Sequence, residues 1–206
     1  MWEYRGVKGD GERPDIVGTY SGRLVILGNS RNVWDDLDKI DTAGADTMVM
    51  GFGAFIVKDF RHAVSMHSEI IGHFNDLRYH GPLRKQPQPI WHGHRDKGVL
   101  PHTVAPKPAS YIPWNLHKPF GYHAMYAARV GICLGYEEII LCGCPLDNAG
   151  CWWEPPADIY NANAYHPRPY TQEESSIKAW RDENLKGKVF SMSGATREIL
   201  GAPPRE

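Results

Sequence analysis

The stretch RLVILGNSRNVWDDLDKI, residues 23–40, decides the fold. Its first six residues are almost continuously apolar and end at Gly28, which is typical of a short strand buried on both faces. From residue 33 onward, apolar side chains recur at helical spacing, and Asn32 stands where a helix cap is expected. A buried strand followed at once by a helix predicts a parallel sheet covered by helices.

The same alternation continues along the rest of the chain. Further strands are expected at residues 46–50, 62–66, 138–143 and 188–192, and further helices at 68–79, 122–135, 171–185 and 195–200. We therefore predict an α/β protein with a single Rossmann-like domain over residues 23–206. Its sheet is expected to be mostly parallel, with helices on both faces. The polar, glycine-rich residues 1–22 are expected to form a flexible arm.

Composition excludes several classes of protein. The chain has 206 residues, 42% of them apolar, which suits one sizeable core. Its 23 basic and 24 acidic side chains leave a net charge of −1, unlike a strongly basic nucleic-acid binder. We expect no membrane span and no signal peptide, because no apolar run approaches roughly 18 residues. All four cysteines fall between residues 133 and 151, which favours a reducing, cytoplasmic compartment over distributed disulfides.

Residues 81–120 interrupt the pattern. They hold eight of the sixteen prolines together with two tryptophans and four histidines, and they show no periodicity. Irregular stretches of this length in a compact domain are usually functional lids or disordered. The aromatic and histidine content favours a lid that folds over a site.

Ligands of open parallel sheets bind outside the carboxyl ends of the strands. On that rule the candidate nucleotide-binding residues are Gly28, Asn29, Ser30, Asn32, Gly51, His67, Gly143 and, as an aromatic wall, Trp153. Backbone amides of the turn at residues 28–30 are expected to hold a phosphate or another polar ligand edge. The plain alternative is that Gly28 only makes a tight turn. The GFGAFI run at 51–56 lacks the third glycine of a dinucleotide fingerprint, and no phosphate loop of the GxxxxGK[ST] type is present.

Two histidine patterns suggest chemistry. His166 lies in a loop before a capped helix, and a loop histidine can act as a general base because imidazole titrates near neutrality. The alternative for His166 is an ordinary surface side chain. His92 and His94 alternate in the sequence and could join a distant aspartate in a metal site, although the spacing is not that of zinc motifs. No metal site is assigned on this basis.

Four segments carry a family resemblance. They are RLVILGNSRNVWDDLDKI, HAVSMHS, AARVGICLGYEEIILCGCPLDNAGCWW and SSIKAWRDENLKGKVFSMSG, in this order. These segments resemble bacterial lipooligosaccharide sialyltransferases, which use CMP-sialic acid, and the resemblance as a whole extends over about half of the chain. The related pterin pyrophosphokinase-like Rossmann proteins share the same skeleton.

The resemblance assigns roles to individual residues. It implies that Asn29 contacts the cytidine phosphate, that His67 replaces a nucleotide-contacting asparagine, and that His166 falls within one position of the family's catalytic base. The family's two phosphate-binding tyrosines correspond here to Asp147 and Trp153, and both are departures. An aspartate repels a phosphate unless a metal intervenes, and a tryptophan offers only an indole N–H.

The function expected from this reading is a glycosyltransferase-like enzyme that uses a nucleotide-activated, CMP-type sugar donor, with His166 and Asp147 as catalytic candidates. Its partners would be the nucleotide sugar and a small-molecule or glycan acceptor; a homo-oligomer is compatible with the sequence. No cofactor is required in this reading. One alternative is a pyrophosphokinase or nucleotide hydrolase in which Asp147 helps to hold Mg²⁺. Another is a module that sequesters a nucleotide without turnover.

Overall fold

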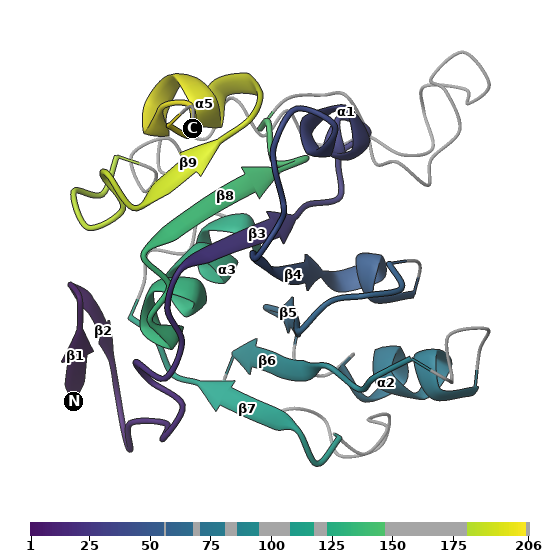
Figure 1. The fold of residues 1–206 in the computed structure, drawn as a ribbon. Helices are drawn as coiled ribbons and strands as arrows, with labels where there is room; N and C mark the ends of the chain where they lie inside the picture. Colours follow the sequence, from purple (N-terminus) through teal and green to yellow (C-terminus); the bar gives the residue numbers. More distant parts are fainter. Residues whose placement is uncertain are drawn as a thin grey trace, which may run out of the picture.

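The computed structural model describes residues 1–55, 57–67, 71–80, 86–94, 108–117, 123–146 and 181–204. Within them, seven parallel strands form one sheet in the order β7-β6-β5-β4-β3-β8-β9 (Figure 1). The strands are β3 (Arg23–Leu27), β4 (Asp46–Met50), β5 (His62–Ser65), β6 (Ile90–His94), β7 (Tyr111–Trp114), β8 (Glu138–Cys142) and β9 (Val189–Ser191). The predicted parallel α/β architecture is confirmed, and all five expected strands form.

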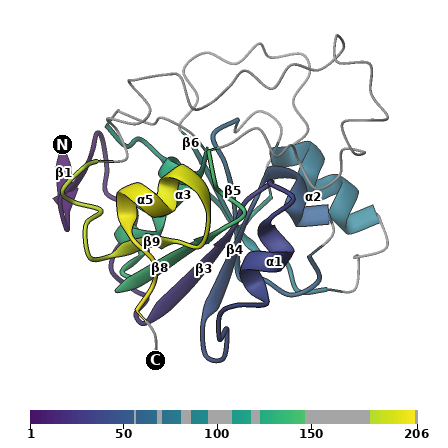
Figure 2. The same cartoon turned by 90° about the horizontal axis from the view of Figure 1, so that it is seen from above.

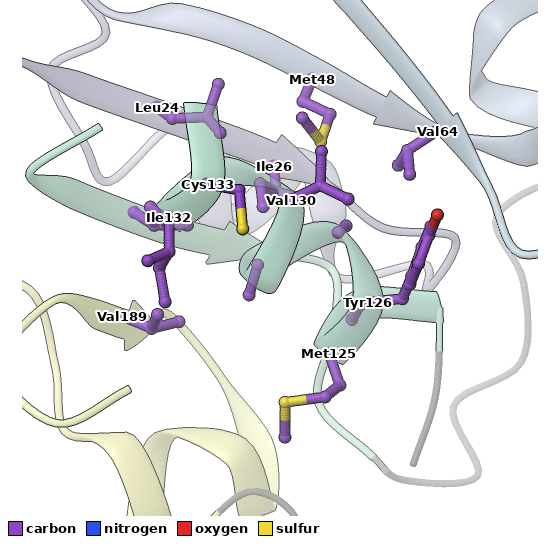
Figure 3. Close-up of a cluster of buried hydrophobic side chains, with 14 of the residues drawn as sticks. Leu24, Ile26, Met48, Val64, Met125, Tyr126, Val130, Ile132, Cys133 and Val189 are labelled. Carbon is purple, nitrogen blue, oxygen red and sulfur yellow. The ribbon is translucent and has the colours of Figure 1, made fainter. Parts of the chain in front are cut away.

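Helices cover both faces of this sheet (Figure 2). They are α1 (Val33–Leu37), the 3-10 helix η1 (Gly51–Phe55), α2 (Ile71–His80), α3 (His123–Leu134) and α5 (Gly194–Leu200). Alternate residues of a strand face opposite sides. Leu24 and Ile26 of β3 accordingly pack in the core beneath α3, as Figure 3 shows, while Val25 and Leu27 pack in the core that includes residues of α1 and α2. None of the described helices combines the length and the apolar character needed to cross a bilayer.

Helix α3 lies unusually close to the sheet. Every side chain from Ala124 to Leu134 is buried. A Cβ atom at Gly131 would lie 2.8 Å from a methyl carbon of Leu24 and 2.9 Å from one of Ile139. The small residues of this helix therefore allow its backbone to approach β3 and β8, and larger side chains would force the two layers apart.

Two strands lie inside the stretch expected to be an irregular lid. β6 and β7 extend the sheet beyond β5, so these parts of residues 81–120 belong to the sheet. Their sequences, IWHGH and YIPW, gave no clear strand signal because histidine, glycine and proline interrupt them. Pro113 is tolerated because β7 is the terminal strand, where a missing N–H need not break a ladder. The remaining described residues of this stretch are 86–89, 108–110 and 115–117.

The first 22 residues are not a flexible arm. They begin with a hairpin of β1 (Trp2–Tyr4) and β2 (Val7–Gly9), and Val7 and Val17 are buried in the core under α3. The N–H groups of Gly18 and Tyr20 donate to the carbonyls at the end of α3, at 2.9 Å each. The prediction failed because few apolar residues, spaced without periodicity, are enough to anchor this segment.

Candidate functional site

The strand order reverses next to β3, which places the candidate site. The chain proceeds from β3 through β4 to β7 on one side, then crosses to β8 and β9 on the other. Ligands of doubly wound sheets bind at the carboxyl ends of the strands where this reversal occurs. That position is occupied by the turn after β3 and the loop after β8, as Figure 1 shows.

The turn and the loop meet at two glycines. Gly28 N–H donates to Cys142 O at 2.7 Å, and a Cβ at position 28 would overlap the carbonyl oxygen of Gly143. Gly143 itself has φ +67°, and a Cβ there would lie 2.6 Å from Cβ of Val33. Close approach of two backbones, rather than turn geometry, is thus what requires glycine at position 28.

Only part of the turn is available as an anion cradle. Ser30 N–H donates to Gly143 O at 3.1 Å, and Gly28 N–H is used as described, so two of the expected amides are bonded within the protein. Ser30 Oγ lies 3.5 Å from Asn32 N. Asn32 does precede α1, but its side chain makes no capping hydrogen bond. The phosphate cradle predicted at residues 28–30 is therefore reduced to the remaining polar groups of the turn.

Asn29 is the polar side chain of this turn that stands out. Its Oδ1 is buried and makes no hydrogen bond with any of the described residues. Its Nδ2 points toward Gly51, at the end of β4, where a Cβ would lie 3.9 Å away. Gly51 has φ +48°, a conformation that favours glycine. The Asn29 amide, at the end of β3, thus lies near the end of β4.

Histidines and a tyrosine continue this edge on the α3 side. The exposed His67 follows β5, and its ring centroid lies 5.1 Å from that of His123, the first residue of α3. His94, the last residue of β6, has its ring centroid 6.1 Å from that of Tyr126. Burial raises the pKa of the Tyr126 hydroxyl well above its ordinary value. Two ring pairs, His67 with His123 and His94 with Tyr126, therefore lie near the carboxyl ends of β5 and β6.

Comparison with known proteins identifies the fold. No protein-family model and no curated protein matches the chain. The sialyltransferase CstII from Campylobacter jejuni, solved with the substrate analogue cytidine-5'-monophosphate, matches with a TM-score of 0.53 and 13% identity over 88% of this chain and 85% of that chain. A single-residue variant of Cst-II in complex with CMP matches with a TM-score of 0.54 and 13% identity, over 88% of this chain and 86% of that chain. The chain resembles bacterial sialyltransferases. At this identity the likeness concerns the fold.

Three predicted site residues lie outside the described residues. They are His166, Asp147 and Trp153. The roles given to them stay predictions: His166 as general base, Asp147 in place of a phosphate-binding tyrosine, and Trp153 as an aromatic wall.

The His92 ring is buried and bonded to other side chains. Its Nδ1 accepts the indole N–H of Trp114 at 3.0 Å, and its Nε2 lies 3.0 Å from Nδ1 of His62. Both ring nitrogens of His92 are therefore engaged in the interior, while His94 lies at the carboxyl end of β6. Among the described residues, no group of three or more histidine, cysteine, aspartate or glutamate side chains is arranged to hold a metal.

The sequence analysis did not single out Asp36 or His123, and it considered His94 only as a possible metal ligand beside His92. Asp36 carried a usable signal: it follows Val33 by three residues and so falls on the apolar face of its helix, where a carboxylate is unexpected. His123 carried none, because it lies at the border of the irregular stretch.

Two hollows elsewhere contain none of the predicted site residues. One of about 840 Å³ lies between residues 10–16 and β7. Another of about 500 Å³ lies at the amino ends of β4 and β5 and is lined in part by Tyr20, Asp46 and Arg61. Neither includes a residue from the turn after β3, so topology and the unpaired Asn29 oxygen select the candidate site.

Proposed function

We propose that this protein binds a cytidine nucleotide at the carboxyl edge of the sheet and transfers a sugar from a CMP-activated donor to a hydroxyl acceptor. The observation that carries the proposal is the Asn29 side chain, whose buried Oδ1 has no hydrogen-bond partner in the part of the chain that the structure describes. An unsatisfied buried acceptor costs about 1–3 kcal/mol, so a ligand N–H or O–H that reaches it is strongly favoured.

The place of this oxygen supports a nucleotide as the ligand. Asn29 follows β3, next to which the strand order reverses, and its amide nitrogen lies near Gly51 at the end of β4. The fold is like that of an enzyme solved with CMP. An exocyclic amine of the base or a ribose hydroxyl could donate to it. The rings of His67 and His123 lie farther along the same edge and could contact the rest of the donor.

His166 is proposed as the general base that removes the proton from the acceptor hydroxyl, because it falls within one position of the catalytic histidine in the resembled family. A positioned base contributes about 10²–10⁴-fold to the rate. We further propose that the reaction requires no cofactor. If a metal held by Asp147 were needed instead, EDTA would abolish turnover and Mg²⁺ would restore it.

Incubation with CMP-sialic acid tests the proposal. Mass spectrometry is expected to detect released CMP together with a sialylated acceptor or free sialic acid, at a rate well above that of buffer alone. If CMP binds but the donor survives intact with a panel of acceptors, the chain is a binding module. If neither nucleotide nor donor binds, the proposed function is wrong.

A further inference from the structure

One buried carboxylate holds the two halves of the candidate site together. Asp36 lies in α1, and only 1% of its surface is exposed. Its Oδ2 accepts the N–H of Gly143 at 2.8 Å and the hydroxyl of Ser193 at 2.7 Å. Ser193 precedes α5, so a single oxygen connects the first helix, the loop after β8 and the start of the last helix.

Gly143, the residue that Asp36 binds, connects the two parts of the candidate site. Gly143 receives the Asp36 bond through its N–H and gives its carbonyl to the N–H of Ser30, in the turn that contains Asn29. A shift of this one residue therefore moves both the turn after β3 and the loop after β8.

The following residues of the loop are fixed from the other side. The carbonyl of Cys144 accepts the hydroxyl of Thr196 at 2.6 Å, and the carbonyl of Pro145 accepts the N–H of Ala195 at 2.8 Å. Leu146 then adopts φ +54°, a left-handed conformation that is unfavourable for a branched side chain. The loop is thus anchored through residue 145 and changes direction at the next residue.

A purely structural role of Asp36 would not require a charged side chain at this buried position. Within the described part of the chain no lysine or arginine forms an ion pair with Asp36. Its effect extends to β8, where burial first and the nearby Asp36 second raise the pKa of the Cys142 thiol to about 12. A buried carboxylate is costly, and two neutral donors compensate it only in part. Charge-assisted hydrogen bonds, however, are shorter and stronger than neutral ones, which suits a carboxylate that must fix a peptide in place.

We propose that Asp36 is a positioning residue for nucleotide binding: by holding the Gly143 peptide through a charged hydrogen bond, it sets the place of the Asn29 turn against the loop after β8. The proposal rests on the proposed function for its ligand, but its geometric part does not depend on any ligand.

The test compares Asp36→Asn with Asp35→Asn. Asparagine keeps the shape and one oxygen that can accept both donors, but it removes the charge. Asp35 is the exposed neighbour on the same helix, so its replacement makes the same change in net charge without touching Gly143. Ser193→Ala, which removes one donor and leaves the carboxylate, is a third variant in case Asp36→Asn does not fold.

Amide hydrogen exchange is measured first, without ligand, and CMP affinity by calorimetry second. In Asp36→Asn we expect the Gly143 and Ser30 amides to exchange about tenfold faster than in the parent, while the amides of β4 and β5 keep their rates. CMP affinity should fall about tenfold, and Asp35→Asn should change neither quantity. Ser193→Ala should leave the Gly143 amide protected, because the carboxylate still accepts its bond.

The outcomes separate this inference from the proposed function. Unchanged exchange at Gly143 and Ser30, or equal acceleration of all sheet amides, would overturn the positioning role. Faster exchange at Gly143 and Ser30 with unchanged CMP affinity would also overturn it, since the Asp36–Gly143 hydrogen bond would then not govern binding. Local acceleration in a protein whose parent binds no CMP would support the geometric part and reject the function.

Discussion

His92 Nε2 lies 3.0 Å from His62 Nδ1, and this contact belongs to a buried chain of hydrogen bonds with one direction. Trp114 can only donate, so its N–H fixes Nδ1 of His92 as an acceptor. A neutral His92 then donates through Nε2 to His62, whose own Nε2 lies 2.9 Å from Oη of Tyr136. Tyr136 donates in turn to Asp46 at 2.5 Å. Each neutral tautomer is therefore determined by its neighbour.

From this chain of hydrogen bonds we predict that the protein loses stability in acid. Any added proton on the two rings would set two N–H groups against each other, and burial lowers the pKa of His62 from 6.5 to about 4 and that of His92 well below its ordinary value. The unfolded chain then binds more protons than the folded one below pH 6.5. Stability should be fully present above that pH and fall between 6.5 and about 4, by about 1.4 kcal/mol per pH unit for each histidine. Urea unfolding across this range measures it.

Replacement of one ring should reduce that dependence. His62→Gln is expected to lower stability at pH 7. It should also reduce the slope of the free energy of unfolding against pH, between pH 6.5 and 4, by the contribution of one histidine. His67→Gln serves as the control, because the His67 ring is exposed, and it should leave the slope unchanged. Equal slopes in the parent and His62→Gln would show that the buried pair does not govern acid stability.

Trp114→Phe isolates the donor end of the chain. Trp114 is fully buried, and phenylalanine removes its N–H while retaining an aromatic ring. We expect a loss of about 1–3 kcal/mol, because Nδ1 of His92 would remain buried without its donor. Denaturant unfolding at pH 7.5 measures the loss, and a change below about 0.5 kcal/mol would contradict the assigned direction of the chain.

Gly28→Ala tests the contact between the turn and the loop. The new methyl group would overlap the Gly143 carbonyl, and both segments are backbone, so neither can rotate away. We expect a loss of about 1–3 kcal/mol in the free energy of unfolding. Gly53→Ala is the matched control, since its Cβ would meet only Val49 at 3.4 Å, an ordinary contact. Equal stability of the two variants would refute the close approach.

His166→Ala tests the proposed base. Turnover of CMP-sialic acid should fall about 10²–10⁴-fold, while the KM for the donor should stay within a few-fold, because a base acts mainly in the transition state. The pH–rate profile should lose an ionisation near neutrality. His117→Ala, which removes a surface histidine paired with Asp10, should leave turnover unchanged. Loss of donor binding in His166→Ala with normal kcat would assign the residue to binding instead.

The central sheet could be predicted because its inner strands are continuous apolar runs. RLVIL and EIILC at β3 and β8 are buried on both faces, and this leaves a strong signal. β6 and β7 could not be predicted, because their interior side chains include His92, which is stable inside only through partners that are distant in sequence. The location of Asn29 at a strand end followed from topology, but its unpaired oxygen could be seen only in the packed structure.

Calorimetric titration of the parent and Asn29→Ala with CMP tests the central claim most directly. We predict that the parent binds CMP and that Asn29→Ala binds it about 5- to 150-fold more weakly, the equivalent of about 1–3 kcal/mol for a lost buried hydrogen bond. Asn115→Ala, beyond β7, should bind like the parent. No heat of binding with the parent, or equal affinity of the parent and Asn29→Ala, would contradict the account.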